Sequence, residues 1–198
     1  MQSPARLFRT LSTTLLLFLG ASASAAVIDF EVGFKFADGI GSSFDVGDYR
    51  FSLTGGQAAT MLVSSQSDIV EGGTSKLFAT NHSEVTMSRI DGGLFDLLSF
   101  DLGGSFVNLP SRWASLVTAT TTAGSASATP SGPTYTNVTA DLFGIDAVSF
   151  IPTINASGGI NNFEFTLDNI VVREAQAVPA PALAGLFLLA IGLLARRR

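Results

Sequence analysis

Apolar and polar side chains alternate along much of this chain, which is the pattern of half-buried β-strands. The segment 27–36 reads VIDFEVGFKF, and 48–53 repeats the alternation with Tyr49, Phe51 and Leu53 on one face. In the first segment the face expected to turn inward holds Ile28, Phe30, Val32, Phe34 and Phe36. Further strands are predicted over 60–63, 83–88, 94–102, 114–119, 135–142, 147–151 and 162–173. No helical period occurs between residues 26 and 177, the segment called the body below.

Two strands change their alternation midway, which predicts a β-bulge or burial on both faces. The change falls between Leu97 and Leu98 in one strand and after Leu167 in the last. Gly-rich turns such as 91–93 separate the strands. The Ser/Thr-rich segment 118–136 reads as a long loop, or alternatively as an O-glycosylated stretch. Many short strands with such turns predict an all-β antiparallel β-sandwich of the jelly-roll type.

The N-terminus has the three parts of a secretory signal peptide. Arg6 and Arg9 precede an apolar run from residue 11 to 20, and the small residues ASASA follow at 21–25. We expect cleavage after Ala25, with Ala23 as the alternative, so residues 1–25 form the signal peptide and the body is exported.

The C-terminus combines prolines, a short apolar run and a basic end. Residues 182–195 hold no charged or polar side chain, and as a helix they would span only about 21 Å at ~1.5 Å per residue. That is short of the ~30 Å hydrocarbon core, although snorkelling arginines can compensate. Arg196, Arg197 and Arg198 favour the cytoplasmic side. An ordinary tail anchor or a late strand are the alternatives.

This arrangement resembles the PEP-CTERM sorting signal of Gram-negative bacteria. The matching residues are Val178, Pro179, Pro181 and the three arginines Arg196, Arg197 and Arg198. The sequence departs at Ala180, where that family most often has Glu. The resemblance covers residues 178–198 and implies an exosortase substrate. Such a chain is held in the inner membrane by its tail, then cut and delivered to the cell surface or the extracellular matrix.

Charge is divided unevenly along the chain. Five of the 11 basic residues lie in the two terminal segments and all 16 acidic residues lie in the body, so the body carries 6 − 16 = −10. Such a surface repels nucleic acid and anionic lipid. The chain has no Cys, so no disulfide supports the fold. A body of this length buries enough surface without one.

The body shows no pattern typical of catalysis. Cys–His chemistry is excluded because there is no Cys, and a serine triad would depend on the single histidine, His82, without a GxSxG motif. No glycine-rich phosphate loop occurs. Two-carboxylate glycoside hydrolysis stays open, because the 16 acids single out no pair. We therefore predict that the protein is not an enzyme.

The body also weakly resembles carbohydrate-binding jelly rolls. Many of these open with a strand ending in Phe-Glu, as at Phe30 and Glu31, and close on a strand like LDNIVV at 167–172. The resemblance implies a structural Ca²⁺ that pins the two strands together, with Glu31 and Asp168 as its ligands. Carboxylate oxygens suit that ion. Two exposed strand carboxylates without a metal are the alternative.

Sugar binding in such folds uses exposed aromatic rings. Trp113 lies in the turn-like sequence PSRWA and Tyr135 follows the Ser/Thr-rich segment, whereas Tyr49 is in phase with its apolar neighbours. Trp113 and Tyr135 are therefore the candidates for stacking on a sugar, although a buried Trp113 that anchors a loop fits equally well.

Together these patterns predict an exported surface or matrix protein. Its body would be a structural or adhesive module, associated with extracellular polysaccharide. A lectin-like carbohydrate-binding module is the first alternative and a polysaccharide hydrolase the second.

Overall fold

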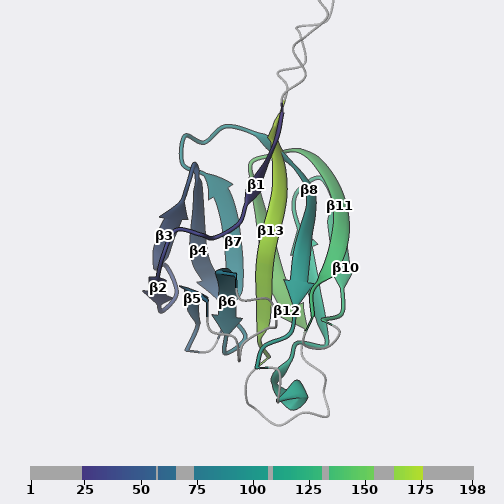
Figure 1. Cartoon of the computed structure of the whole chain (residues 1–198). Helices are drawn as coiled ribbons and strands as arrows, with labels where there is room; N and C mark the ends of the chain where they lie inside the picture. The colour runs from purple at the N-terminus through teal and green to yellow at the C-terminus, as the bar shows by residue number, and fades with distance from the viewer. Residues whose placement is uncertain are drawn as a thin grey trace, which may run out of the picture.

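The computed structural model describes residues 24–56, 58–65, 74–106, 109–130, 134–153 and 163–175. They form two antiparallel β-sheets that pack face to face (Figure 1). The predicted β-sandwich is therefore confirmed. Most of the predicted signal peptide and the whole C-terminal motif from Val178 to Arg198 lie outside the described residues. Within the described part, no helix has the length and apolar character needed to cross a membrane.

Seven strands form the first sheet, sheet A, and six form the second, sheet B. Sheet A contains β1 (Ala25–Ile28), β2 (Lys35–Asp38), β5 (Thr60–Ser64), β6 (Lys76–Thr80), β8 (Phe95–Gly103), β11 (Thr136–Ile145) and β13 (Phe165–Glu174). Sheet B contains β3 (Ser43–Val46), β4 (Tyr49–Gly55), β7 (Glu84–Arg89), β9 (Leu116–Thr120), β10 (Ser125–Ala128) and β12 (Ala147–Thr153). A short 3-10 helix, Pro110–Arg112, precedes β9.

The strand order has the jelly-roll arrangement that the sequence predicts. From β6 onward the chain passes back and forth between the sheets, with β9 and β10 as consecutive strands of sheet B. As a result β6, β8, β11 and β13 lie in sheet A and β7, β9, β10 and β12 in sheet B. Their orders, β11-β8-β13-β6 and β10-β9-β12-β7, face each other. The strands β5 and β2 extend sheet A, β4 and β3 extend sheet B, and β1 pairs with β13. The last strand of the chain thus lies in the interior of sheet A.

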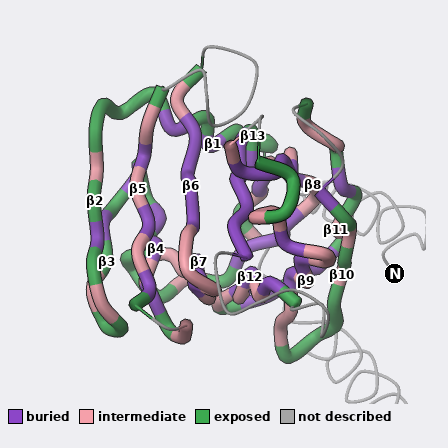
Figure 2. Tube along the Cα trace, turned by 90° about the horizontal axis from the view of Figure 1, so that it is seen from below, coloured by how far each residue is buried: buried purple, intermediate pink, exposed green. Residues whose placement is uncertain are grey.

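Phenylalanine side chains fill the space between the sheets. Figure 2 shows buried stretches along the strands of both layers. Phe100 of β8 and Phe150 of β12 are fully buried and meet edge to face at 5.2 Å between ring centroids. Burying such a ring contributes roughly 1.5–3 kcal/mol. The predicted inward positions Tyr49, Phe51 and Leu53 are all buried, which confirms that strand and its orientation.

The prediction of one strand over 27–36 is wrong beyond Phe30. Phe30 has a positive φ of 58°, and there the chain leaves β13 and crosses to pair with β5 as β2. This turn reverses the alternation, so Ala37 is buried while Phe34 and Phe36 are 75% and 54% exposed. Val32 also points outward, at 43% exposed. A left-handed phenylalanine is unfavourable by local sterics. Phe30 is fully buried, and burial of an aromatic ring is favourable enough to offset such a cost.

Both predicted changes of alternation are confirmed as β-bulges. β8 pairs Ser99 with Val171 but Leu97 with Val172, so β8 holds one extra residue at Leu98. β13 in turn holds an extra residue between Asp168 and Val171, where Asn169 has a φ of 44°. Asn tolerates this left-handed backbone better than most residues. The bulges let each strand keep apolar side chains inside on both sides of the irregularity.

Three strands were missed by the sequence reading. β6 was not predicted, because residues 76–79 are all buried and show no alternation. β10 lies within 118–136, so that segment is not the single long loop expected. β3 directly precedes a tight turn into β4. The uniformly buried residues of β6 and the small residues of β10 carry no period-two signal, whereas the short strand β3 does alternate and was overlooked.

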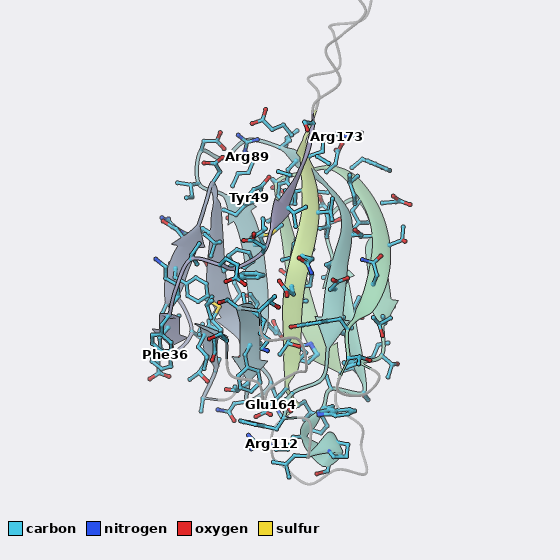
Figure 3. The ribbon with its side chains drawn as sticks, in the orientation of Figure 1. Phe36, Tyr49, Arg89, Arg112, Glu164 and Arg173 are labelled. Carbon is cyan, nitrogen blue, oxygen red and sulfur yellow. The ribbon has the colours of Figure 1, made fainter. Side chains whose placement is uncertain are left out.

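The first and last strands lie side by side at one end of the sandwich. Ala25 pairs with Arg173, so both ends of the described chain leave from the same pole. Arg89 of sheet B joins this pole to sheet A through Glu174, at 3.0 Å. Figure 3 shows Arg89, Tyr49 and Arg173 at this end and Arg112 and Glu164 at the opposite end. Any terminal extension therefore begins far from that opposite pole.

Candidate functional site on the outer face of sheet A

The outer face of sheet A buries polar side chains that a bare sheet would expose. Lys76 and Thr166 are fully buried and Asp168 is 2% exposed, although all three point away from the core between the sheets. Residues from connecting segments lie over them. Thr74 donates its hydroxyl to Asp168 at 3.2 Å, and Phe106 and Tyr135 pack against Phe78. This covered face contains most of the residues singled out from the sequence.

Asp168 is the central polar group of this face. Its carboxylate accepts hydrogen bonds from Thr74 and from the backbone N–H of Asn169 at 2.8 Å. Burial raises the pKa of this carboxyl to about 6, and the neighbouring carboxylates of Asp101 and Glu31 act in the same direction. Its two hydrogen bonds lower the pKa but do not cancel the effect of burial. The fold therefore holds a carboxylate in a place that disfavours its charge.

The neighbouring carboxylate of Asp101 is held by two amides. Asn137 of β11 and Asn169 of β13 donate their side-chain N–H groups to it at 2.8 and 2.9 Å. Asp101 lies directly opposite Asp168 in the β8–β13 pairing. The left-handed bulge residue Asn169 thus contacts both carboxylates, one through its backbone and the other through its side chain.

Glu31 lies at the edge of this cluster. Its Oε1 accepts the backbone N–H of Ser75 at 2.9 Å, and its charge acts on Asp168. The two residues named as calcium ligands are therefore neighbours in the fold. A buried carboxylate with added negative charge beside it has the donor chemistry that Ca²⁺ requires. Among the described residues no three acidic or imidazole side chains converge, so hydroxyl and backbone oxygens would have to complete the coordination.

An aromatic cluster adjoins the carboxylates. Phe78 is 3% exposed and meets Phe106 edge to face at 5.6 Å, with Leu62 and Tyr135 packed beside them. The Tyr135 hydroxyl is buried without a hydrogen-bond partner of normal geometry. Burial, and then the charge of Asp168, raise the pKa of this hydroxyl above its ordinary range. Tyr135 is therefore part of the packing of this face.

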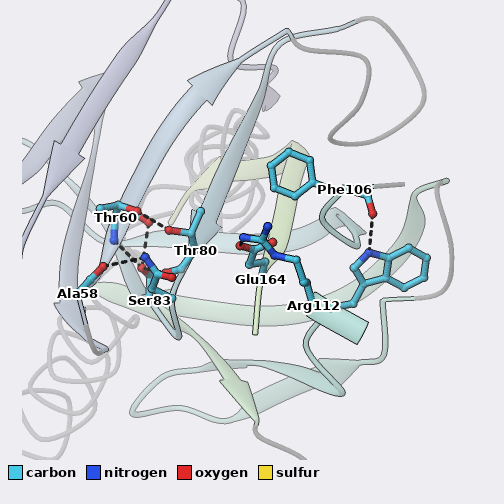
Figure 4. Close-up of polar contacts among 9 residues, drawn as sticks. Ala58, Thr60, Thr80, Ser83, Phe106, Arg112 and Glu164 are labelled. Carbon is cyan, nitrogen blue, oxygen red and sulfur yellow. Dashed lines mark hydrogen bonds and ion pairs between the residues drawn. The ribbon is translucent and has the colours of Figure 1, made fainter. Parts of the chain in front are cut away.

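Trp113 is held by its surroundings in the same way. Its indole N–H donates to the carbonyl of Phe106 at 3.1 Å (Figure 4). Its ring lies directly on Gly104. A Cβ at Gly104 would come within 2.7 Å of the ring, so only glycine allows this contact. Trp113 also forms an isolated β-bridge with Glu164. The structure thus favours the second reading of Trp113, as the anchor of a loop.

An ion pair between a half-buried arginine and a buried glutamate lies beside this tryptophan. Arg112 binds the carboxylate of Glu164, which is fully buried, and the Arg112 guanidinium also lies 4.9 Å from the centroid of the Phe106 ring. Burial raises the pKa of Glu164, while Ser105 and Arg112 lower it. Ser105 lies close enough for this effect but makes no hydrogen bond of normal geometry. This pair fixes the 3-10 helix to the start of β13.

The sequence had pointed to Glu31, Asp168, Trp113 and Tyr135. The fold brings Glu31, Asp168 and Tyr135 to one side of sheet A, and Trp113 is joined to them through Phe106. The sequence did not point to Asp101, Asn137, Arg112 and Glu164. Asp101 and Asn137 meet through the pairing of β8 with β11, and Arg112 of the 3-10 helix meets Glu164 just before β13. Both contacts join segments far apart in sequence, so no local motif could have indicated them. His82 lies elsewhere, with its ring 4.6 Å from Phe163. The hydroxyl of its neighbour Ser83 is bonded to the Thr60 carbonyl at 2.9 Å.

No family model and no curated protein matches the chain. Solved structures to which the chain is similar at low identity include three carbohydrate-binding modules. A mutant of a family 29 carbohydrate-binding module is 14% identical, with a TM-score of 0.39 over 76% of this chain and 91% of that one. The C-terminal family 22 carbohydrate-binding module of Clostridium thermocellum Xyn10B is 13% identical, with a TM-score of 0.40 over 77% and 94%. A family 29 module from Piromyces equi is 10% identical, with a TM-score of 0.38 over 80% and 95%.

Replacing Asp168 by Asn is expected to change how stability depends on pH. The pKa of about 6 exceeds the ordinary value of 3.8, so the folded state binds the proton more tightly than the unfolded state. This contribution is fully present below the unfolded pKa of 3.8, is largely retained at pH 4.5 and is lost as the pH rises through 6. Asp168→Asn should therefore be more stable than the wild type at pH 7, by a margin that narrows at pH 4.5, in urea unfolding with EDTA.

Asp91→Asn is the matched control for this experiment. Arg89 lowers the pKa of Asp91 to about 2, so its charge favours folding and the variant should gain no stability at pH 7. A loss of stability in Asp168→Asn at pH 7 that disappears at pH 4.5 would show that the buried charge is favourable.

Replacing Trp113 by Ala tests whether this ring is part of the fold. The loss of its packing on Gly104 and of its hydrogen bond should destabilise the chain by about 2–3 kcal/mol, less than for a fully buried ring. Phe143→Ala, at a position 54% exposed on β11, should change stability by less than about 0.5 kcal/mol. Urea unfolding measures both. An unchanged stability in Trp113→Ala would leave this ring available for a ligand.

Proposed function

We propose that this chain is an exported surface or matrix protein. Its β-sandwich would act as a structural and adhesive module, associated with extracellular polysaccharide. The observation that carries the proposal is that the aromatic rings and carboxylates of sheet A are used in internal contacts. The lectin-like and hydrolytic alternatives both need these same groups to be free.

A lectin-like site needs aromatic rings whose faces are open to a sugar. Trp113 lies on Gly104 with its N–H already bonded, and Tyr135 has its hydroxyl buried in the cluster with Phe78. Neither ring is among the large apolar side chains that are highly exposed. These contacts favour the structural role over recognition through stacked aromatics.

A glycoside hydrolase needs two carboxyl groups that reach a sugar from opposite sides. Asp101 and Asp168 are the closest pair by strand register, but Asp168 is 2% exposed and Asp101 is held by Asn137 and Asn169. Glu164 is fully buried against Arg112. These groups are engaged in stabilising the fold, which supports the proposal of a protein that is not an enzyme.

The two ends of the chain support export and sorting. The signal peptide over 1–25 would direct the body out of the cytoplasm, and the tail over 178–198 would hold it at the inner membrane. An exosortase-type transpeptidase would then cut near Val178, Pro179 and Pro181. β13 ends at Glu174, so this motif begins within a few residues of the folded sandwich. Arg196, Arg197 and Arg198 would stay on the cytoplasmic side.

Processing of the tail can be tested by mass spectrometry of the C-terminal peptide from fractions of the native host. We expect a species that ends within 178–181 and is found outside the inner membrane. Replacing both Pro179 and Pro181 by Ala should leave the chain uncut, because the extended conformation of the motif is lost. Gln176→Asn, just outside the motif, should be processed normally. An intact chain ending in Arg198 and confined to the inner membrane would contradict the sorting proposal.

We also propose that Ca²⁺ stabilises the body through Glu31 and Asp168. The buried charge of Asp168 and its proximity to Glu31 support this. Adding Ca²⁺ at pH 7 to about a hundredfold excess over its dissociation constant should contribute about 2.7 kcal/mol, a rise in melting temperature of roughly 5–10 °C. The rise should vanish in Asp168→Ala and persist in Asp146→Ala, an exposed acid. No rise in the wild type would contradict the proposal.

A further inference from the structure

A row of hydroxyl side chains crosses the whole of sheet B. The strand registers place Ser43 opposite Ser52, Ser52 opposite Thr86, and Thr86 opposite Ser149. They then place Ser149 opposite Thr120, and Thr120 opposite Ser125. Every strand of the sheet contributes one Ser or Thr to this line, called the hydroxyl row below: Ser43, Ser52, Thr86, Ser149, Thr120 and Ser125.

The hydroxyl row faces away from the core. Phe51, Met87 and Phe150, which alternate with its members along the strands, are fully buried, whereas the row residues are half-buried or exposed. Hydrogen bonds connect its centre: Thr86 and Ser149 are 2.7 Å apart through their hydroxyl oxygens, and Thr86 and Thr54 are 2.9 Å apart. These bonds fix the orientation of the central side chains.

This face carries little charge. Among the outward positions of the sheet B strands only Asp45, Arg50 and Glu84 are charged, and Asp45 and Arg50 pair with each other at 2.9 Å near the edge. A soluble surface usually has about 25–35% charged residues, and the body as a whole carries 6 − 16 = −10. A neutral face of hydroxyls on such an acidic body favours a ligand that is itself uncharged and rich in hydroxyl groups.

We propose that the hydroxyl row binds an extended neutral polysaccharide that lies across the strands. This inference rests on the proposed association with extracellular polysaccharide and assigns a surface to it. Ser and Thr hydroxyls both donate and accept, as sugar hydroxyls do. Strands about 4.8 Å apart give a row about 24 Å long, with successive hydroxyls spaced close to the length of one sugar residue in an extended chain.

Other occupants fit this face less well. An anionic polysaccharide would be repelled by the net charge of the body. Protein partners usually bury a core enriched in aromatic residues and Met. Among the outward positions of the described sheet B strands, the large apolar side chains are Leu116 and Ile151, and none is aromatic or Met. Each hydroxyl contact with a sugar replaces a hydrogen bond to water, so its net contribution to the binding free energy is small. Binding is therefore weak at each position and depends on the number of positions used along the row.

The test is affinity electrophoresis of the full-length chain in non-ionic detergent. The gels contain a mixed-linkage β-glucan, a galactomannan, a xylan or, as the anionic comparison, polygalacturonate. The test variant combines Thr86→Val, Ser149→Ala and Thr120→Val, which removes three central hydroxyls and keeps the shape of the side chains. The matched control combines Ser99→Ala and Thr139→Val, an opposed hydroxyl pair on the outer face of sheet A.

We expect at least one neutral polysaccharide to retard the wild type and the control equally, and polygalacturonate to retard neither. The triple variant should bind at least tenfold more weakly. Ser149→Glu, a single change that places a charge at the centre of the row, should also lose retardation and covers the case in which the triple variant does not fold.

The outcomes distinguish a failure of this inference from a failure of the proposed association with polysaccharide. Unchanged retardation of both the folded triple variant and Ser149→Glu would overturn the hydroxyl row as the binding surface and leave polysaccharide association intact. Failure of every neutral polysaccharide to retard the wild type would overturn both. Equal loss in the sheet A control would overturn the assignment to sheet B.

Discussion

The position of β13 inside sheet A is the constraint on which the rest of the structure depends. This strand pairs with β1, β6 and β8. Three segments from distant parts of the sequence therefore depend on it for their backbone hydrogen bonds. Such non-local pairing carries a large loop-closure cost, which is repaid only when the whole sandwich forms. The bulge at Asn169 is part of the same constraint. The bulge lets β13 pair with β6 before Asn169 and with β1 after it, while Leu167 and Ile170 both stay in the core.

The polar cluster on sheet A is a consequence of this arrangement. Because β13 is covered on its outer face as well, Asp168 and Thr166 lose contact with water and need partners from neighbouring strands and connecting segments. Asn169 supplies two of the contacts that hold Asp101 and Asp168 together. Asp101 and Asp168, which resemble a functional site, therefore also help to hold the strands together. The burial that raises the pKa of Asp168 is a result of the strand topology.

Local patterns predicted the elements whose two faces differ. Tyr49, Phe51 and Leu53 were placed correctly because β4 is buried on one face and open on the other. β6 was missed because residues 76–79 are buried on both faces. The strand over 27–36 failed at Phe30, where a left-handed residue reverses the alternation three residues before the glycine of the segment, Gly33.

The sequence likewise predicted only some residues of the candidate site. Glu31 and Asp168 were named from their resemblance to known opening and closing strands. The amides that hold Asp101 belong to strands whose pairing no local pattern reveals. Trp113 illustrates a further limit, because its role depends on the absence of a side chain at Gly104, and nothing near Trp113 in sequence indicates that contact.

The two outer faces of the sandwich are thus suited to different tasks. On sheet A the central polar groups are buried and bound to one another, so a sugar that used them would have to break contacts that support the fold. On sheet B the central hydroxyls are oriented by their own cross-strand bonds and remain at the surface. A ligand there replaces water without reorganising the protein, and such preorganisation lowers the cost of binding. A module that adheres to a polymer through many weak contacts is better served by the second kind of face, because each contact can form and break while the sandwich stays intact.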